Sequence, residues 1–253
     1  MLRPRVIPCL LLHDEGLVKT TVFKNPRYIG DPINTVRLFN EKEVDELIIL
    51  DIDATVQCRE PNFRLISELA AECRMPLCYG GGITNISQAR QIISLGVEKL
   101  AFGTAASETP SLISELATEI GSQSIVVVLD VKTGLFGKQQ VWTHNGTKNT
   151  WSSPLEIATQ SMKLGAGEVL INSIDRDGLM TGYDLKLAQK IRDAINLPIT
   201  VLGGAGSLAD IAELFEKCGV VGAAAGSLFV FKGDFKAVLI SYPSSFEKDK
   251  LCH

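Results

Sequence analysis

Short apolar runs alternate along the chain with longer segments of helical period, and this alternation restricts the fold more than any other feature. The runs are apolar at nearly every position, as strands are in a parallel sheet covered on both faces. Eight of them are expected to form strands: Val6–Leu12, Leu47–Ile52, Leu77–Tyr79, Lys99–Phe102, Ile125–Val131, Val169–Asn172, Ile199–Leu202 and Val221–Ala224. Eight strands alternating with helices over 253 residues predict an α/β fold, a single (β/α)8 TIM barrel over residues 1–253. A doubly wound open sheet is the alternative.

The segments between these runs carry helix start and stop signals. Asp31-Pro32, Thr109-Pro110 and Ser153-Pro154 each place a capping residue before a proline that suits the first helical turn. Gly96 and Gly165 stand where helices are expected to end, just before the next strand. These signals support the strand–helix alternation.

An internal repeat indicates two similar halves. Asp31-Pro32 recurs as Ser153-Pro154 and Met75-Pro76 as Leu197-Pro198, in both cases 122 residues later. A closed barrel built from two similar half-barrels accommodates such a repeat. The only clear insertion is expected at residues 134–150, whose Gly, Asn, Thr and Trp indicate a hairpin-like excursion.

Composition excludes several classes of protein. A net charge of −4 argues against a nucleic-acid partner. No apolar run approaches the ~20 residues of a membrane span, and no charged-then-apolar leader opens the chain, so a cytoplasmic protein is expected. The six cysteines form no C-x-x-C pair, and the His, Cys and carboxylate residues show no ligand spacing. We therefore expect reduced, mostly buried thiols and neither a metal nor another cofactor.

Glycines follow four of the expected strands, at the end of a barrel where active sites lie. They are Gly80-Gly81-Gly82, Gly103-Thr104, Gly203-Gly204-Ala205-Gly206 and Gly226-Ser227. Glycine lets backbone N–H groups approach an anion, although tight turns alone would explain any single pair. Matched pairs in both halves favour two phosphate sites and an elongated bisphosphate ligand.

Carboxylates gather at the same end of the strands: Asp51, Asp53, Asp130, Asp175 and Asp177. Asp130 ends an apolar run and is expected to act as a general acid or base. For Asp51 a structural carboxylate, and for Asp177-Gly178 a simple turn, are equally good interpretations. The corresponding end of the first strand has no acid, because it reads Leu10-Leu11-Leu12.

Four charged residues precede or begin strands at the opposite end of the barrel. Arg5, Glu46 and Glu168 come just before the first, second and sixth strands, and Lys99 stands at the start of the fourth. Exposed surface charges of little energetic value are the alternative interpretation. The repeat makes Glu46 and Glu168 equivalent, which supports the hypothesis that the four charges close a ring.

The combination of these motifs is specific. The matching segments run through the whole chain and include Arg5-Val6-Ile7-Pro8-Cys9-Leu10, Gly30-Asp31-Pro32, Asp45-Glu46-Leu47, Leu50-Asp51-Ile52, Leu129-Asp130-Val131-Lys132, Gly165-Ala166-Gly167-Glu168, Asp175-Arg176-Asp177-Gly178 and Gly203-Gly204-Ala205-Gly206. With them the chain resembles the HisF family, the cyclase subunit of imidazole glycerol phosphate synthase. In that family a glutaminase docks on the bottom of the barrel, and ammonia crosses its interior to a ribulosyl phosphate substrate.

The resemblance implies roles for individual residues. Asp130 would be one of the two catalytic aspartates of the cyclisation, and Lys19 would lie on the loop that closes over the substrate. A charged gate at the ammonia entrance would comprise Arg5, Glu46, Lys99 and Glu168. The two phosphates would bind at Gly82, Thr104, Asp177, Gly178, Gly204, Gly226 and Ser227.

The sequence departs from the family pattern at two positions. Leu11 stands where the second catalytic aspartate belongs, and leucine cannot transfer a proton. Gly103 replaces the usual asparagine, which weakens one phosphate contact. Since a positioned acid or base typically contributes 10²–10⁴-fold, impaired cyclase activity is expected.

A subgroup of the family is more similar. WbuZ-type glycosyl amidation-associated paralogues share the opening Ile7-Pro8-Cys9-Leu10-Leu11-Leu12 and the segments Lys24-Asn25-Pro26 and Pro76-Leu77-Cys78-Tyr79. The resemblance implies that the chain pairs with a HisH-like glutaminase and delivers ammonia to an N-acetyl-sugar amidotransferase for polysaccharide biosynthesis. An active cyclase of histidine biosynthesis is the second hypothesis, and a phosphosugar isomerase of the related half-barrel type is the third.

Overall fold

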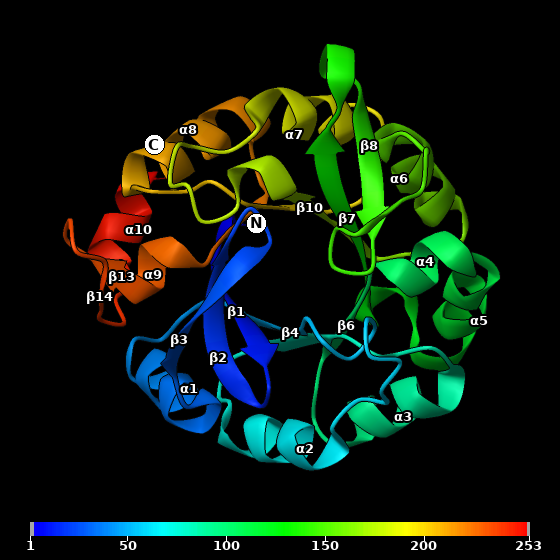
Figure 1. Ribbon diagram of the computed structural model, residues 1–253, viewed down its shortest axis with the longest axis horizontal. Helices are drawn as coiled ribbons and strands as arrows, with labels where there is room; N and C mark the ends of the chain where they lie inside the picture. Colours follow the sequence, from blue (N-terminus) through cyan, green and yellow to red (C-terminus); the bar gives the residue numbers. More distant parts are fainter. Residues whose placement is uncertain (1–2, 252–253) are drawn as a thin grey trace.

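A computed structural model describes residues 3–251 and shows a closed barrel of eight parallel strands (Figure 1). The strands are β1 (Arg5–His13), β4 (Leu47–Asp51), β5 (Leu77–Gly80), β6 (Lys99–Phe102), β7 (Ile125–Thr133), β10 (Glu168–Ser173), β11 (Ile199–Leu202) and β12 (Gly222–Ala225). The barrel closes where β12 pairs with β1, and β7 also pairs with β10. The predicted (β/α)8 barrel is confirmed, and the open sheet is excluded.

Helices surround the strands, as Figure 1 shows. They are α1 (Pro32–Glu41), α2 (Phe63–Glu72), α3 (Ile86–Ser94), α4 (Thr104–Glu108), α5 (Ser111–Ile120), α6 (Pro154–Lys163), α7 (Leu185–Arg192), α8 (Leu208–Cys218), α9 (Ser227–Val230) and α10 (Ser245–Leu251). Among residues 3–251, none of the helices combines the length and the apolar character that crossing a membrane requires.

Local sequence signals explain where several helices begin and end. The Asp31 side chain accepts a hydrogen bond from the backbone of Asn34, and Ser153 forms a reciprocal capping box with Glu156. The expected cap at Thr109 is wrong: α5 begins after Pro110, and no side chain caps it. Prolines at the first helical positions of α1 and α6 have no N–H to satisfy, which suits those positions.

The barrel strands separate two apolar cores, because successive side chains of a strand point to opposite faces. The larger core lies between strands and helices. The smaller one fills the barrel interior and comprises Ile7, Cys9, Ile48, Cys78, Ala101, Val126, Val128, Leu170, Leu202 and Ala224, with Leu11 and Leu50 packed against it. The interior is therefore apolar between its two ends.

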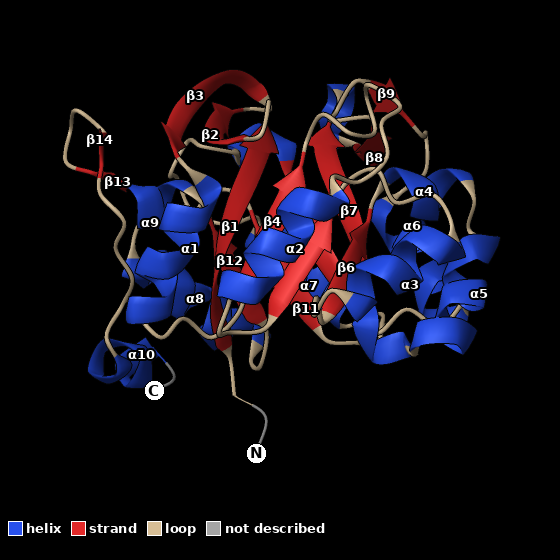
Figure 2. Cartoon of the chain, turned by 90° about the horizontal axis from the view of Figure 1, so that it is seen from below, coloured by secondary structure: helices blue, strands red, loops and turns tan. Residues whose placement is uncertain are grey.

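Three hairpins interrupt the alternation of strands and helices. The expected excursion after β7 is confirmed as β8 (Gln139–Thr143) and β9 (Lys148–Asn149). It is not the only insertion, because β2 (Gly16–Thr21) and β3 (Lys24–Gly30) form a hairpin on β1. A short pair, β13 (Phe231–Lys232) and β14 (Ala237–Val238), follows α9. Figure 2 shows β2–β3 and β8–β9 at one end of the barrel and α10 at the other.

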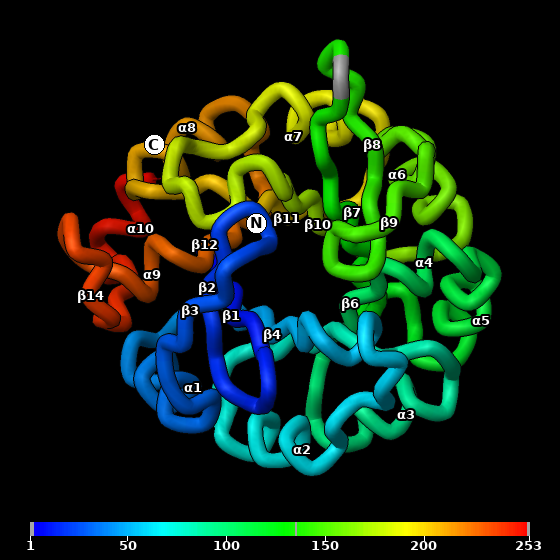
Figure 3. The backbone as a smooth tube through the Cα atoms, viewed as in Figure 1, coloured from blue at the N-terminus to red at the C-terminus, as the bar shows by residue number. Residues whose placement is uncertain are grey.

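The backbone trace in Figure 3 follows one circuit around the barrel, from blue through green to red, which brings β12 beside β1. Of the cysteines, Cys9, Cys78 and Cys218 are buried, Cys73 is partly exposed and Cys58 is exposed, and all five are free thiols. Cys252 lies outside the described residues.

Candidate functional site

A cavity of about 1090 Å³, its open mouth included, occupies the carboxyl ends of the strands. Glycines from all four predicted turns, in both halves of the barrel, line this cavity. Of the predicted phosphate and substrate residues, those that line the cavity are Lys19, Thr104, Asp177, Gly178, Gly204, Gly226 and Ser227. Gly82 does not line the cavity, although its N–H donates at 3.4 Å to the hydroxyl of Thr55, which does; its neighbour Gly81 lines the wall.

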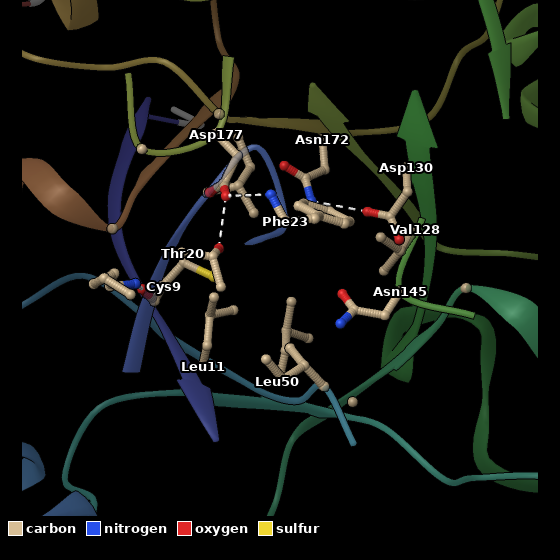
Figure 4. Close-up of a pocket in the computed structure, with 18 of the residues that line it drawn as sticks. Cys9, Leu11, Thr20, Phe23, Leu50, Val128, Asp130, Asn145, Asn172 and Asp177 are labelled. Atoms are coloured by element: carbon tan, nitrogen blue, oxygen red, sulfur yellow. Dashed lines mark hydrogen bonds between the residues drawn. The ribbon is translucent and has the colours of Figure 1, made fainter. Parts of the chain in front are cut away.

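Asp130 lines the cavity and is partly buried. Burial raises the pKa of its carboxyl to about 6, although the hydrogen bond from Asn172, 2.8 Å long, acts in the opposite direction. Figure 4 shows the two side chains side by side. A carboxyl that titrates close to neutral pH is suited to exchanging protons with a ligand.

Leu11 lines the same cavity from the other side of the barrel (Figure 4). Its strand, β1, is separated from the strand of Asp130, β7, by three strands in either direction around the ring. Leu50 is paired with Leu11 on the next strand and also lines the cavity. These two leucines make part of the wall opposite Asp130 apolar, and no acid stands at position 11, although Asp51 also lines the cavity.

Lys19 differs from the expectation, because it lies in strand β2 and not in a loop. Its side chain is buried, and its ammonium donates to the backbone carbonyl of Cys9 and lies against Gly226. Burial lowers the pKa of Lys19, because removal from water disfavours the charged form. The Lys19 side chain lines the cavity together with the Gly226-Ser227 turn.

Asp177 anchors the β2–β3 hairpin. Its carboxylate accepts hydrogen bonds from the Thr20 hydroxyl at 2.6 Å and from the N–H of Phe23 at 3.1 Å (Figure 4). Gly178 has a φ of +68°, and a side chain there would collide with the Thr20 carbonyl. Asp177 and Gly178 thus form a turn, as one interpretation predicted, and they also line the cavity.

The four charged residues at the opposite end do form a closed ring. Glu168 accepts from Arg5 at 2.7 Å and from Lys99 at 2.8 Å, while Glu46 accepts from Lys99 at 2.9 Å and is also paired with Arg5. The Thr200 hydroxyl donates to Glu168 at 2.5 Å. The alternative of independent surface charges is wrong, because the two glutamate side chains are only 5% and 7% exposed.

The electrostatics of the ring favour its charged forms. Burial tends to raise the pKa of Glu168, but the charges of Arg5 and Lys99 outweigh it and lower the pKa. For Lys99, burial tends to lower the pKa, and the attraction of Glu168 and Glu46 raises it. The Glu168 carboxylate is therefore favoured in its ionised form between two cations.

The other predicted carboxylates have structural partners. Asp51 accepts from the N–H groups of Asp53 and Ala54, both at 3.0 Å, and Asp175 accepts from Thr133 at 2.7 Å. His13, Asp14 and Asp53 bring their donor atoms within 4.8 Å of one another. The His13 ring is already hydrogen-bonded to Asp53 at 2.8 Å, and this bond raises the pKa of His13, so the ring has a partner within the cluster.

Three polar residues near these sites were not predicted. Asn172 contacts Asp130, Thr200 contacts the charged ring, and Asn145 reaches the cavity from the turn between β8 and β9. Asn172 and Thr200 each stand two positions from an interior residue of their strand, Leu170 and Leu202, and so share its face, a period-two signal that could have located them. Nothing in the local sequence pattern places Asn145 in the cavity.

Comparison with known proteins agrees with this architecture. A family model described as "Histidine biosynthesis protein" matches residues 5–236. A Leptospira borgpetersenii protein, "Putative imidazole glycerol phosphate synthase subunit HisF", is 54% identical over 252 residues, 99% of each chain. "Putative imidazole glycerol phosphate synthase subunit hisF3" of Vibrio vulnificus (strain YJ016) is 55% identical over 251 residues, 99% of this chain and 96% of its own.

Less similar relatives carry the name "Imidazole glycerol phosphate synthase subunit HisF" without the word "Putative". "Imidazole glycerol phosphate synthase subunit HisF" of Lactococcus lactis subsp. cremoris (strain SK11) is 40% identical over 230 residues, 90% of this chain and 89% of its own. The match therefore extends over nearly the whole barrel, including both ends described above. The chain belongs to the histidine biosynthesis protein family and, within it, to the HisF family.

Proposed function

We propose that this barrel conducts ammonia from a HisH-like glutaminase partner to a sugar amidation reaction of surface polysaccharide biosynthesis, with its cyclase activity impaired by Leu11. The observation that carries the proposal is the combination of an intact charged ring with Leu11 facing Asp130 across the cavity. Ammonia conduction needs the ring and the barrel interior. Cyclisation needs a pair of proton-transferring groups in the cavity as well.

The route of ammonia is proposed along the barrel axis. The charged ring lies at the amino ends of the strands and the cavity at their carboxyl ends, with apolar side chains such as Ile7, Ile48 and Leu170 between them. An apolar interior favours neutral ammonia over ammonium, because burying an unpaired charge is costly. The four ring charges form ion pairs with one another, and these pairs hold the side chains at the proposed ammonia entrance.

The proposed complex is a cytoplasmic heterodimer of the barrel and the glutaminase, which docks over the charged ring. An N-acetyl-sugar amidotransferase would receive the ammonia. The glycine turns and the buried Lys19 support binding of a phosphorylated small molecule in the cavity. The proposal requires no cofactor, nucleic acid or membrane.

An active cyclase of histidine biosynthesis is the second candidate, giving imidazole glycerol phosphate and the aminoimidazole carboxamide ribotide AICAR. Asp130 favours it, since its pKa of about 6 suits acid–base catalysis near neutral pH. The retained phosphate-facing turns support it equally. What this candidate lacks is a proton-transferring side chain at position 11.

Ammonia-dependent turnover of the ribulosyl imidazole-carboxamide ribotide separates the two candidates. We expect the wild-type chain to be inactive or very slow and Leu11→Asp to gain about 10²–10⁴-fold. Leu11→Asn is the matched control, because it is polar and similar in size to aspartate but cannot supply the proton, and it should gain nothing. Wild-type turnover equal to that of Leu11→Asp would overturn the amidation proposal and establish the cyclase.

A further inference from the structure

We infer that Asn145 is a ligand-binding residue, whose side-chain amide donates a hydrogen bond to an anionic oxygen of the phosphorylated ligand beside Gly103 and Thr104. The inference rests on the proposed binding of such a ligand in the cavity. It assigns to the β8–β9 turn a contact that a glycine at position 103 has no side chain to make.

The β8–β9 turn holds Asn145 in a defined place. His144, Asn145 and Gly146 all have left-handed backbones, with φ values of +52°, +52° and +72°. Two consecutive non-glycine residues in this region are uncommon and persist only where the surroundings fix them. The N–H of His144 donates to the Thr104 hydroxyl at 3.1 Å, so the turn is tied directly to the cavity wall.

Further contacts fix the turn from its outer side. Lys148 forms an ion pair with Glu108 of α4 at 2.6 Å, and the N–H of Thr147 donates to the Thr143 carbonyl at 3.1 Å. Glu108 thus neutralises the lysine outside the cavity. The turn approaches the cavity through Asn145, which lines it.

The Asn145 amide is available to a ligand. Within residues 3–251 its side chain makes no hydrogen bond, and Figure 4 shows it extending into the cavity near Leu50. Leu50 and Val128, which line the same cavity, offer this amide no hydrogen-bond acceptor. An anionic oxygen would complete them, with the backbone groups of Gly103 and the Thr104 hydroxyl on the same wall.

The backbone conformation at position 103 does not require a glycine, so a residue with a side chain would be tolerated there. The φ of Gly103 is −100°, a value open to any residue, and the nearest atom to an added Cβ would be that of Val128, at an ordinary 3.8 Å. Gly81, in contrast, has a φ of +118° and would collide with Asp51. A side chain could therefore stand at position 103, and its absence leaves space on the wall that Asn145 faces.

The test is a titration of the 15N-labelled barrel alone with inorganic phosphate, followed by NMR. The amide signals of Gly103 and Thr104 report one side of the cavity, and those of Gly226 and Ser227 report the other. Asn145→Ala should weaken binding at the first side about tenfold, the usual effect of one hydrogen bond to a charged group. Binding at the second side should stay unchanged, which controls for misfolding.

Two further variants keep the test specific. Gly103→Asn added to Asn145→Ala should restore wild-type binding at the first side, because it places an amide on the same wall. Asn145→Asp should bind phosphate less well than Asn145→Ala, since two negative charges would face each other. Unchanged binding in Asn145→Ala, or no recovery in the double variant, would overturn the inference.

The wild-type titration separates this inference from the proposed function. Phosphate that binds in the wild type but ignores residue 145 would refute the role of Asn145 alone. Absence of phosphate binding at either side of the wild-type cavity would refute the inference and the proposed phosphorylated ligand together. Ammonia conduction is measured only in the complex with the glutaminase, and neither result would affect it.

Discussion

Asn172 and Asp130 occupy paired positions on the neighbouring strands β10 and β7, and the Asn172 amide donates to the Asp130 carboxylate at 2.8 Å. Burial raises the pKa of Asp130, and this one hydrogen bond opposes the rise. The carboxyl therefore titrates at about 6 rather than higher. The nearby charge of Asp177 adds to the rise, whereas the opposite wall carries Leu11 and so no acid at that position.

Because the pKa of Asp130 is raised in the folded protein, its ionisation lowers the free energy of unfolding as the pH rises. The native carboxyl titrates at about 6 and a free one at 3.8, so the native state holds the proton more tightly. Its stabilising contribution is complete below pH 3.8 and is lost as the pH rises through 6. Asp130→Asn should therefore be more stable than wild type at pH 8 by about 3 kcal/mol. The difference should disappear near pH 4.

Urea unfolding at several pH values measures this dependence. Asp234→Asn, at an exposed position of the β13–β14 hairpin, is the control and should show the same small difference at every pH. A stability difference for Asp130→Asn that does not change between pH 4 and pH 8 would contradict the raised pKa.

Lys99 should be needed for coupling at the charged ring. Lys99→Ala leaves Glu46 and Glu168 with Arg5 as their only remaining cation in the ring, so the entrance loses its closed arrangement. In the complex with the glutaminase, we expect glutamine hydrolysis to continue while the amidated product formed per glutamine falls several-fold. The ratio of the two rates is the measurement. Lys163→Ala, at an exposed position on α6, should keep the wild-type ratio, and an unchanged ratio in Lys99→Ala would contradict a role for the ring.

Most of the barrel could be predicted because its strands are buried on both faces. Runs such as Ile125–Leu129 are apolar at every position and need no partner to be recognised. The β2–β3 hairpin could not, since the first five residues of β3, Lys24–Tyr28, are exposed and carry no alternation. Its position depends on distant contacts, above all those of Asp177 with Thr20 and Phe23.

The site residues likewise separate into those that a local sequence pattern predicts and those that depend on distant contacts. The charged ring could be predicted because charges such as Arg5 and Lys99 directly adjoin buried strands and so must face one end of the barrel. Asn145 could not, because a turn between two short strands carries no periodic pattern that fixes its direction. The burial of Lys19 could not be predicted either, because it depends on how the β2–β3 hairpin packs on β1.

Thr200 should position Glu168 within the charged ring. Its hydroxyl is buried and donates at 2.5 Å to the carboxylate oxygen that also accepts from Arg5. Thr200→Val preserves the shape but leaves that oxygen with one donor fewer, at a cost of about 1.5–3 kcal/mol. Thermal or urea unfolding measures the loss. Thr118→Val, at an exposed position on α5, should change stability by less than about 0.5 kcal/mol, and an equal effect in both variants would refute this assignment.

Helix capping offers a matched pair of positions with the same local sequence signal and different structures. Ser153 caps α6 through a capping box with Glu156, whereas Thr109 precedes α5 without a side-chain hydrogen bond to its backbone. Ser153→Ala removes an acceptor from a backbone N–H at the helix start and should cost about 1 kcal/mol. Thr109→Ala removes none and should leave stability nearly unchanged. The two unfolding free energies, measured side by side, check this, and a loss at Thr109 as large as that at Ser153 would show that Thr109 also caps its helix.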